Sequence, residues 1–120
     1  MKSRINKCDL SREYYFDEGC FITELSNTPD DPLLSIARAR VEPGITTKWH
    51  YLRRVTERYV ILEGTGRVEV GGLEPQVVNA GDTVIIPPEV RQRISNIGEN
   101  SLIFLAICSP RFDDSEYVNI

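Results

Sequence analysis

The sequence predicts an all-β protein, built as a sandwich or barrel of short strands, and three observations carry this prediction. Short runs rich in Val, Ile, Leu, Tyr and Thr recur along the chain. Turns that contain Gly, Pro or Asn separate these runs at near-regular spacing. The stretch "GRVEVGG" (66–72) alternates charged and apolar residues, which is typical of a strand with one buried face.

The elements follow from these patterns in chain order. Residues 9–16 are expected to form a short helix or an edge segment, because they are the only part with a weak helix signal. The strands that we expect after it lie at 20–25, 33–41, 47–52, 58–64, 66–72, 76–80, 83–88, 91–96 and 102–108. The acidic tail "FDDSEYVNI" is expected to pack on the outside or to fray.

Length and composition exclude several classes of protein. The chain has 120 residues, 41% of them hydrophobic, which fits a single domain, 1–120, with a core of its own. The net charge of −4 argues against nucleic-acid binding, which needs a dense basic patch. No apolar run reaches the roughly 20 residues of a membrane span, and the first residues lack a signal-peptide core, so we expect a cytoplasmic protein. The three cysteines are too widely spaced for a zinc motif and are expected to be free thiols.

The chain has one histidine, His50, and strand alternation predicts its neighbours. In a strand, residues two apart share a face. Glu57, Tyr59 and Ile61 therefore point the same way from one strand, as His50 and Leu52 do from the strand before it. The short loop between the two strands allows His50 and Glu57 to meet inside a barrel.

The spacing of these residues resembles that of the cupin superfamily, whose fold is a double-stranded β-helix or jelly-roll barrel. The first cupin motif, G-x5-H-x-H-x3,4-E-x6-G, matches Gly44, His50, Glu57 and Gly64, but Leu52 stands where the second histidine belongs.

The second cupin motif, G-x5-P-x-G-x2-H-x3-N, is matched by Gly81, Pro87 and Asn96. Glu89 stands where this motif has a glycine, and Gln92 stands where it has a histidine. The resemblance covers about 34–108. It implies a cupin barrel there, with an N-terminal strand segment and the C-terminal tail packing outside it.

The resemblance also implies a site. Cupins of this kind hold a divalent metal through three histidines and a glutamate. The corresponding set here is His50, Glu57 and Gln92, because Leu52 supplies no ligand. Imidazole and carboxylate suit Zn, Mn, Fe or Ni, whereas an amide oxygen is a weak ligand.

Three interpretations of the site stay open at this stage. The first is a divalent metal on His50, Glu57 and Gln92. The second is a metal-free pocket whose polar groups bind a small molecule or transfer protons, with His50, Glu57, Gln92 and Tyr59 as candidates. The third is a set of buried polar groups that only satisfy one another.

For function, we expect a small cupin that binds a metal and a small sugar-like or carboxylate molecule. The alternatives are a metal-free binding module, with Arg38 or Arg40 as an inward anion contact, and an acid/base isomerase or epimerase. The resemblance further implies a homodimer. The sequence leaves the orientation of four residues open, because a slip of one residue in a strand exchanges its two faces: Arg38, Arg40, Arg91 and Cys108.

Overall fold

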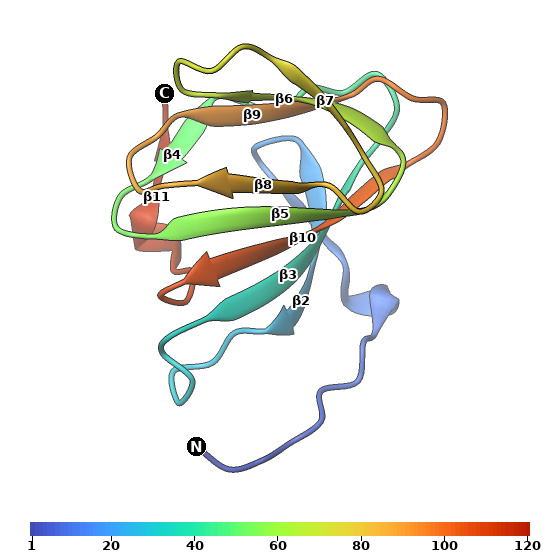
Figure 1. Ribbon diagram of the computed structural model, residues 1–120. Coiled ribbons are helices and arrows are strands. Elements are labelled where there is room, and N and C mark those ends of the chain that lie inside the picture. The colour runs from blue at the N-terminus through green and yellow to red at the C-terminus, as the bar shows by residue number, and fades with distance from the viewer.

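The computed structural model describes all 120 residues and consists almost entirely of strands in two sheets (Figure 1). The six-stranded sheet has the order β1-β2-β3-β10-β5-β8, and the five-stranded sheet has the order β11-β4-β9-β6-β7. All strand pairs are antiparallel. The prediction of an all-β, double-stranded β-helix barrel is confirmed.

Every strand expected from the sequence is present, with shifts of a few residues at the ends. The elements are η1 (Leu10–Arg12), β1 (Tyr14–Phe16), β2 (Cys20–Ser26), β3 (Ser35–Val41), β4 (His50–Leu52), β5 (Thr56–Glu63), β6 (Thr65–Val70), β7 (Gln76–Asn79), β8 (Thr83–Ile86), β9 (Gln92–Asn96), β10 (Leu102–Ser109), η2 (Asp114–Glu116) and β11 (Tyr117–Asn119). Residues 9–16 hold both expected features, since the 3-10 turn η1 is followed by the edge strand β1.

The C-terminal tail differs from the expectation that it packs outside the barrel or frays. Tyr117–Asn119 forms β11, which pairs with β4 along its whole length, and Tyr117 lies opposite Leu52. The tail therefore forms the edge of the five-stranded sheet beside β4 (Figure 1), with Asn119 opposite His50. The N-terminal segment likewise extends the six-stranded sheet through β1 and β2.

Two glycine positions of the cupin motifs have the left-handed backbone that favours glycine. Gly64 has φ +90°, and a Cβ there would lie 2.8 Å from the carbonyl oxygen of Ser101, so only glycine fits without a shift of the backbone. Glu89, which replaces a motif glycine, keeps the left-handed backbone of that position with φ +66°.

The register places the core toward one end of the strands. Leu102 lies opposite Val41, and Phe104 lies opposite Ile61. These four side chains are at most 3% exposed and belong to one hydrophobic cluster with the inner residues of β6, β7, β8 and β9. Further along the same strands, Cys108 lies opposite both Ser35 and Glu57, so the inner face becomes polar toward the other end.

Candidate functional site

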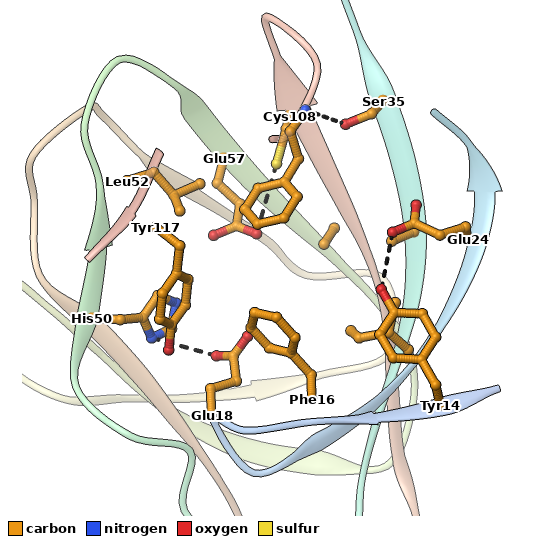
Figure 2. Close-up of a pocket in the computed structure, with 14 residues that line it drawn as sticks. Tyr14, Phe16, Glu18, Glu24, Ser35, His50, Leu52, Glu57, Cys108 and Tyr117 are labelled. Atoms are coloured by element: carbon orange, nitrogen blue, oxygen red, sulfur yellow. Dashed lines mark hydrogen bonds and ion pairs between the residues drawn. The ribbon is translucent and has the colours of Figure 1, made fainter. Parts of the chain in front are cut away.

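The polar end of the barrel interior contains a pocket with a volume of about 50 Å³, which is more than one ordered water needs (Figure 2). It is lined by Tyr14, Phe16, Glu18, Ile22, Glu24, Ser35, Ala37, His50, Leu52, Glu57, Ala106, Cys108, Phe112 and Tyr117. These residues come from β1, β2, β3, β4, β5, β10 and β11 and from two turns. Both sheets and both chain ends therefore contribute to one cavity.

His50 is held as a neutral imidazole at one wall of the pocket. It is 2% exposed, and its Nδ1 lies 2.8 Å from the carbonyl oxygen of Lys48. A carbonyl only accepts, so Nδ1 carries the proton and Nε2 keeps its lone pair. Burial lowers the pKa of His50 below its usual value, whereas the hydrogen bond to the Lys48 carbonyl acts to raise it. The ring stacks on Tyr117 at a centroid distance of 4.9 Å and an interplanar angle of 18°.

Glu57 projects from β5 into the same pocket. Its Oε1 is buried and has no hydrogen-bond partner, and its Oε2 lies 3.8 Å from the Cys108 sulfur. Burial raises the pKa of Glu57 to about 7, although the nearby Gln92 amide and Cys108 thiol act in the opposite direction. A carboxyl group with this pKa exchanges a proton readily near neutral pH.

Glu18 is a second carboxyl group in the pocket, and the sequence analysis did not predict it. It lies in the turn between β1 and β2, and its Oε2 is 3.4 Å from His50 Nδ1 (Figure 2). Burial and the charge of Glu57 raise the pKa of Glu18 to about 8, whereas Cys20 lowers it. The two carboxyl groups therefore influence each other's ionisation.

Tyr59 and Gln92 form a polar pair next to the pocket. The Tyr59 hydroxyl donates a hydrogen bond to Gln92 Oε1, and Gln92 Nε2 is buried without a partner. Both side chains are at most 3% exposed, and neither is among the residues that line the cavity. Burial raises the pKa of Tyr59, so its hydroxyl stays protonated.

The sequence left the orientation of Arg38 and Arg40 open, and the structure places neither of them in the pocket. Within β3 the inner positions are taken by Ser35, Ala37 and Ala39, so Arg38 and Arg40 point outward. There they form ion pairs with Glu13, with N–O distances of 3.4 Å and 2.7 Å. No arginine or lysine lines the pocket.

The two other residues whose orientation the sequence left open lie on opposite faces. Cys108 is buried and lines the pocket. Arg91 is exposed, with its guanidinium 4.9 Å from the centre of the Trp49 ring.

The donor set is a poor fit for a divalent metal. His50 and Glu57 share the pocket, and Gln92 lies beside Glu57. However, Gln92 Oε1 already accepts the hydrogen bond from Tyr59, and its free atom is an NH₂ group, which cannot act as a ligand. No group of three or more His, Cys, Asp or Glu side chains is arranged to hold a metal ion. We therefore assign no chemical step to a metal.

Two residues of the pocket gave no signal in the sequence. Glu18 lies in the turn "DEG", which reads as an ordinary polar turn, and Tyr117 lies in the acidic tail. Tyr117 reaches the pocket because β11 pairs with β4, which is distant in the sequence. Glu18 reaches it from the turn between β1 and β2. A pattern within one strand cannot reveal such contacts.

The fold and the pocket together define a small double-stranded β-helix barrel with an interior site. The sequence profile of the Cupin domain family (Cupin_2) matches residues 37–108, and the chain belongs to this family. The match to the cupin motifs is thereby confirmed.

The chain is also similar to individual proteins. It is 32% identical over 118 residues to the uncharacterized protein MJ1618 of Methanocaldococcus jannaschii, covering 97% of this chain and 94% of that protein. The structure of KdgF from Halomonas sp. superimposes with a TM-score of 0.81 at 19% identity, covering 95% of this chain and 99% of that one. A single-residue variant of Streptomyces PAC13 with uridine superimposes with a TM-score of 0.78 at 19% identity, covering 100% and 92%. At these identities the two structures establish the fold alone.

No helix in the structure has the length and apolar character needed to cross a membrane.

Proposed function

We propose that the protein binds a small polar organic molecule in the pocket and transfers a proton to or from it, with Glu57 as the base and Glu18 as the acid. The observation that carries this proposal is the buried, unpartnered Oε1 of Glu57 in a cavity that also holds Glu18 and His50. A buried polar atom without a partner costs free energy, which a bound ligand would recover. The uridine bound by PAC13 is an example of a small polar molecule held by a protein with this fold.

The ionisation of the pocket supports an acid and a base at the same pH. Burial raises the pKa of Glu57 to about 7 and that of Glu18 to about 8, and the charge of an ionised Glu57 adds to the rise at Glu18, so near neutral pH one carboxyl group can be ionised while the other holds a proton. The Glu57 carboxylate can remove a proton from the ligand, and the Glu18 carboxyl group can return one at another atom. His50 Nε2 accepts a hydrogen bond from a ligand hydroxyl and orients it. A proton returned at a neighbouring atom gives an isomer, and a proton returned to the opposite face of the same carbon gives an epimer; Glu57 then releases its proton to water and Glu18 regains one, so the reaction needs no other reactant.

Divalent-metal binding by His50, Glu57 and Gln92 remains the second hypothesis from the sequence. It requires Gln92 to turn its amide oxygen into the pocket and to give up the hydrogen bond from Tyr59. The proton-transfer proposal needs no such rearrangement, and we favour it for this reason.

Hydrogen–deuterium exchange into candidate ligands tests the proposal. The protein is incubated in D₂O with pools of aldoses, ketoses and amino sugars, whose C–H next to the carbonyl is acidic, and mass spectrometry detects deuterium at carbon. We expect incorporation into at least one compound, lost in Glu57→Gln and in Glu18→Gln. Glu63→Gln serves as a matched control, because Glu63 lies on the same strand but is exposed. The absence of incorporation from every pool, or equal incorporation by the two pocket variants, would refute proton transfer.

The homodimer inferred from the resemblance also belongs to this proposal. Leu62 and Ile85 on β5 and β8 are 43% and 63% exposed, which supports an apolar contact between two copies. Light scattering during size-exclusion chromatography would give about twice the chain mass for the dimer, and the mass of one chain would refute it.

A further inference from the structure

The charge of the pocket residues restricts the class of ligand that the pocket can bind. This inference rests on the proposed function, because it takes the pocket as the binding site. Three glutamates line it, Glu18, Glu24 and Glu57, and no arginine or lysine does. His50 is neutral, since its Nδ1 proton goes to a backbone carbonyl and burial disfavours the charged form. The cavity therefore offers carboxyl oxygens and lone pairs, but no positive charge.

Charged groups around the pocket do not reverse this balance. Near Glu24, Arg111 is the one cation that affects its ionisation, and Asp114 opposes it. Arg111 is held by Asn27, with 2.8 Å between Nε and Oδ1. Asp17 adds a further negative charge near Tyr117.

Two acceptor atoms of the pocket residues make no hydrogen bond. Glu57 Oε1 is buried without a hydrogen-bond partner, although the Gln92 amide lies beside this carboxyl group, and His50 makes a hydrogen bond only through Nδ1, which leaves Nε2 free. A ligand that satisfies both must carry N–H or O–H donors. A carboxylate ligand would instead bring a second negative charge to a desolvated carboxyl group, which is strongly unfavourable.

Aromatic rings surround the same space. Phe16 meets Tyr117 edge to face, with centroids 5.2 Å apart and planes at 88°, and Phe112 and Tyr14 also line the cavity. The faces of aromatic rings attract cations, and the attraction increases where water is excluded.

We infer that the pocket selects a primary or secondary amine, bound as an ammonium ion whose N–H groups donate to Glu57 Oε1 and His50 Nε2 while its apolar part contacts Phe16 and Tyr117. This replaces the sugar-like or carboxylate ligand expected from the sequence with a cationic one. The reason is the outward orientation of Arg38 and Arg40, which leaves no anion contact in the pocket.

Binding of such a cation should also release protons. The pKa values of Glu57 and Glu18 lie near neutrality because the charged carboxylates are poorly solvated. A bound ammonium next to Glu57 favours the ionised form of this residue, so its proton leaves upon binding, while the charge of the ionised Glu57 favours the protonated form of Glu18.

A matched ligand series tests the inference without any turnover. n-Butylamine, butan-1-ol and butanoate share one alkyl chain and differ in charge. Their dissociation constants are measured at pH 7.5 and constant ionic strength, by titration calorimetry in two buffers of different protonation enthalpy and by NMR shifts of the His50 ring. We expect butylamine to bind at least tenfold more tightly than butanol, butanoate to show no saturable binding, and the amine enthalpy to depend on the buffer.

Two variants complete the test. In Glu57→Gln, thermal unfolding first establishes that the variant is folded, and the preference for amine over alcohol should then fall to about threefold or less. Glu63→Gln should keep the full preference. Butanol or butanoate binding as tightly as the amine, binding by none of the three at 50 mM (roughly the range for weak fragments), or an unchanged preference in Glu57→Gln would each overturn the inference. Amine binding without deuterium exchange would refute proton transfer and leave this inference standing.

Discussion

The two ends of the barrel interior are built from the same strands but have opposite character. On β5, Ile61 packs in the core at 1% exposure, whereas Glu57, four residues earlier on the same inner face, has a buried oxygen without a partner. On β10, Leu102 and Cys108 show the same change from apolar packing to contact with a carboxyl group. The larger cluster of buried apolar side chains lies at one end, and a smaller one, with Leu52 and Val55, lies at the pocket end, where burying carboxyl groups costs stability.

The largest effect is expected from truncating the core. Leu102 is 0% exposed, so Leu102→Ala should lower the free energy of unfolding by about 2–5 kcal/mol, measured by urea denaturation. Leu52→Ala at the pocket should cost less, because it enlarges an existing cavity instead of creating a new one. An equal loss from both variants would contradict the division of the interior into a core end and a pocket end.

The pocket end should make stability depend on pH. The pKa values of Glu57 and Glu18 in the folded protein are about 7 and 8, above the unfolded value of 4.5. The folded state therefore holds more protons between these values, and stability falls as the pH rises from about 5 to 8, by roughly 6 kcal/mol for the two groups together.

His50 acts in the opposite sense over part of this range. Its pKa is lowered in the folded state, so its contribution to stability is lost as the pH falls below the unfolded value of 6.5. Urea denaturation across this pH range measures the sum, and the double variant with Glu18→Gln and Glu57→Gln should show a flatter profile. A wild-type profile that rises steadily to pH 8 would contradict the raised pKa values.

Tyr117 links the C-terminal strand to the pocket. Tyr117→Leu removes the stacking on His50 and the edge contact with Phe16. We expect a loss of about 1–2 kcal/mol in the free energy of unfolding and weaker butylamine binding. Tyr117→Phe keeps both ring contacts and should change the stability little. If Tyr117→Leu left amine binding unchanged, the tail would not be part of the site.

Substitutions on the outer face of β3 should change stability and ligand affinity very little. Arg40 forms its ion pair with Glu13 at a position where both side chains are partly exposed, 24% and 19%. Arg40→Met should therefore cost less than about 1 kcal/mol, and butylamine affinity should stay unchanged. A marked change in ligand affinity would show that the arginines of β3 act on the pocket after all.

Metal removal is expected to have no effect. Treatment with EDTA should leave the thermal unfolding temperature unchanged, because the free atom of Gln92 is a donor and the set lacks a third ligand. Elemental analysis should find metal well below one ion per chain. Near-stoichiometric metal in the wild type that is lost in His50→Ala would instead support the metal hypothesis.

Features that depend on neighbours in the sequence could be predicted, whereas features that depend on contacts between distant parts of the chain could not. Strand alternation and motif spacing correctly placed His50 and Glu57 on inner faces of one barrel, because both depend on neighbours within a few residues. Glu18 and Tyr117 were missed, because they enter the pocket through a turn and an edge strand whose partners are far away in the chain. The face of the β3 arginines could not be predicted because "ARAR" alternates in either phase, and only the packing selects alanine for the inside.

The most direct test of the account is an NMR titration of the glutamate side-chain carboxyl carbons in ¹³C-labelled protein, with Glu18→Gln and Glu57→Gln used for assignment. We predict two carboxyl groups that titrate near pH 7 and 8, and a fall in the pKa of Glu18 when Glu57 is replaced, because the charge of Glu57 contributes to its shift. Titration of every glutamate below about pH 5, in the ordinary range for exposed carboxyl groups, would contradict a desolvated acid–base pair in the pocket.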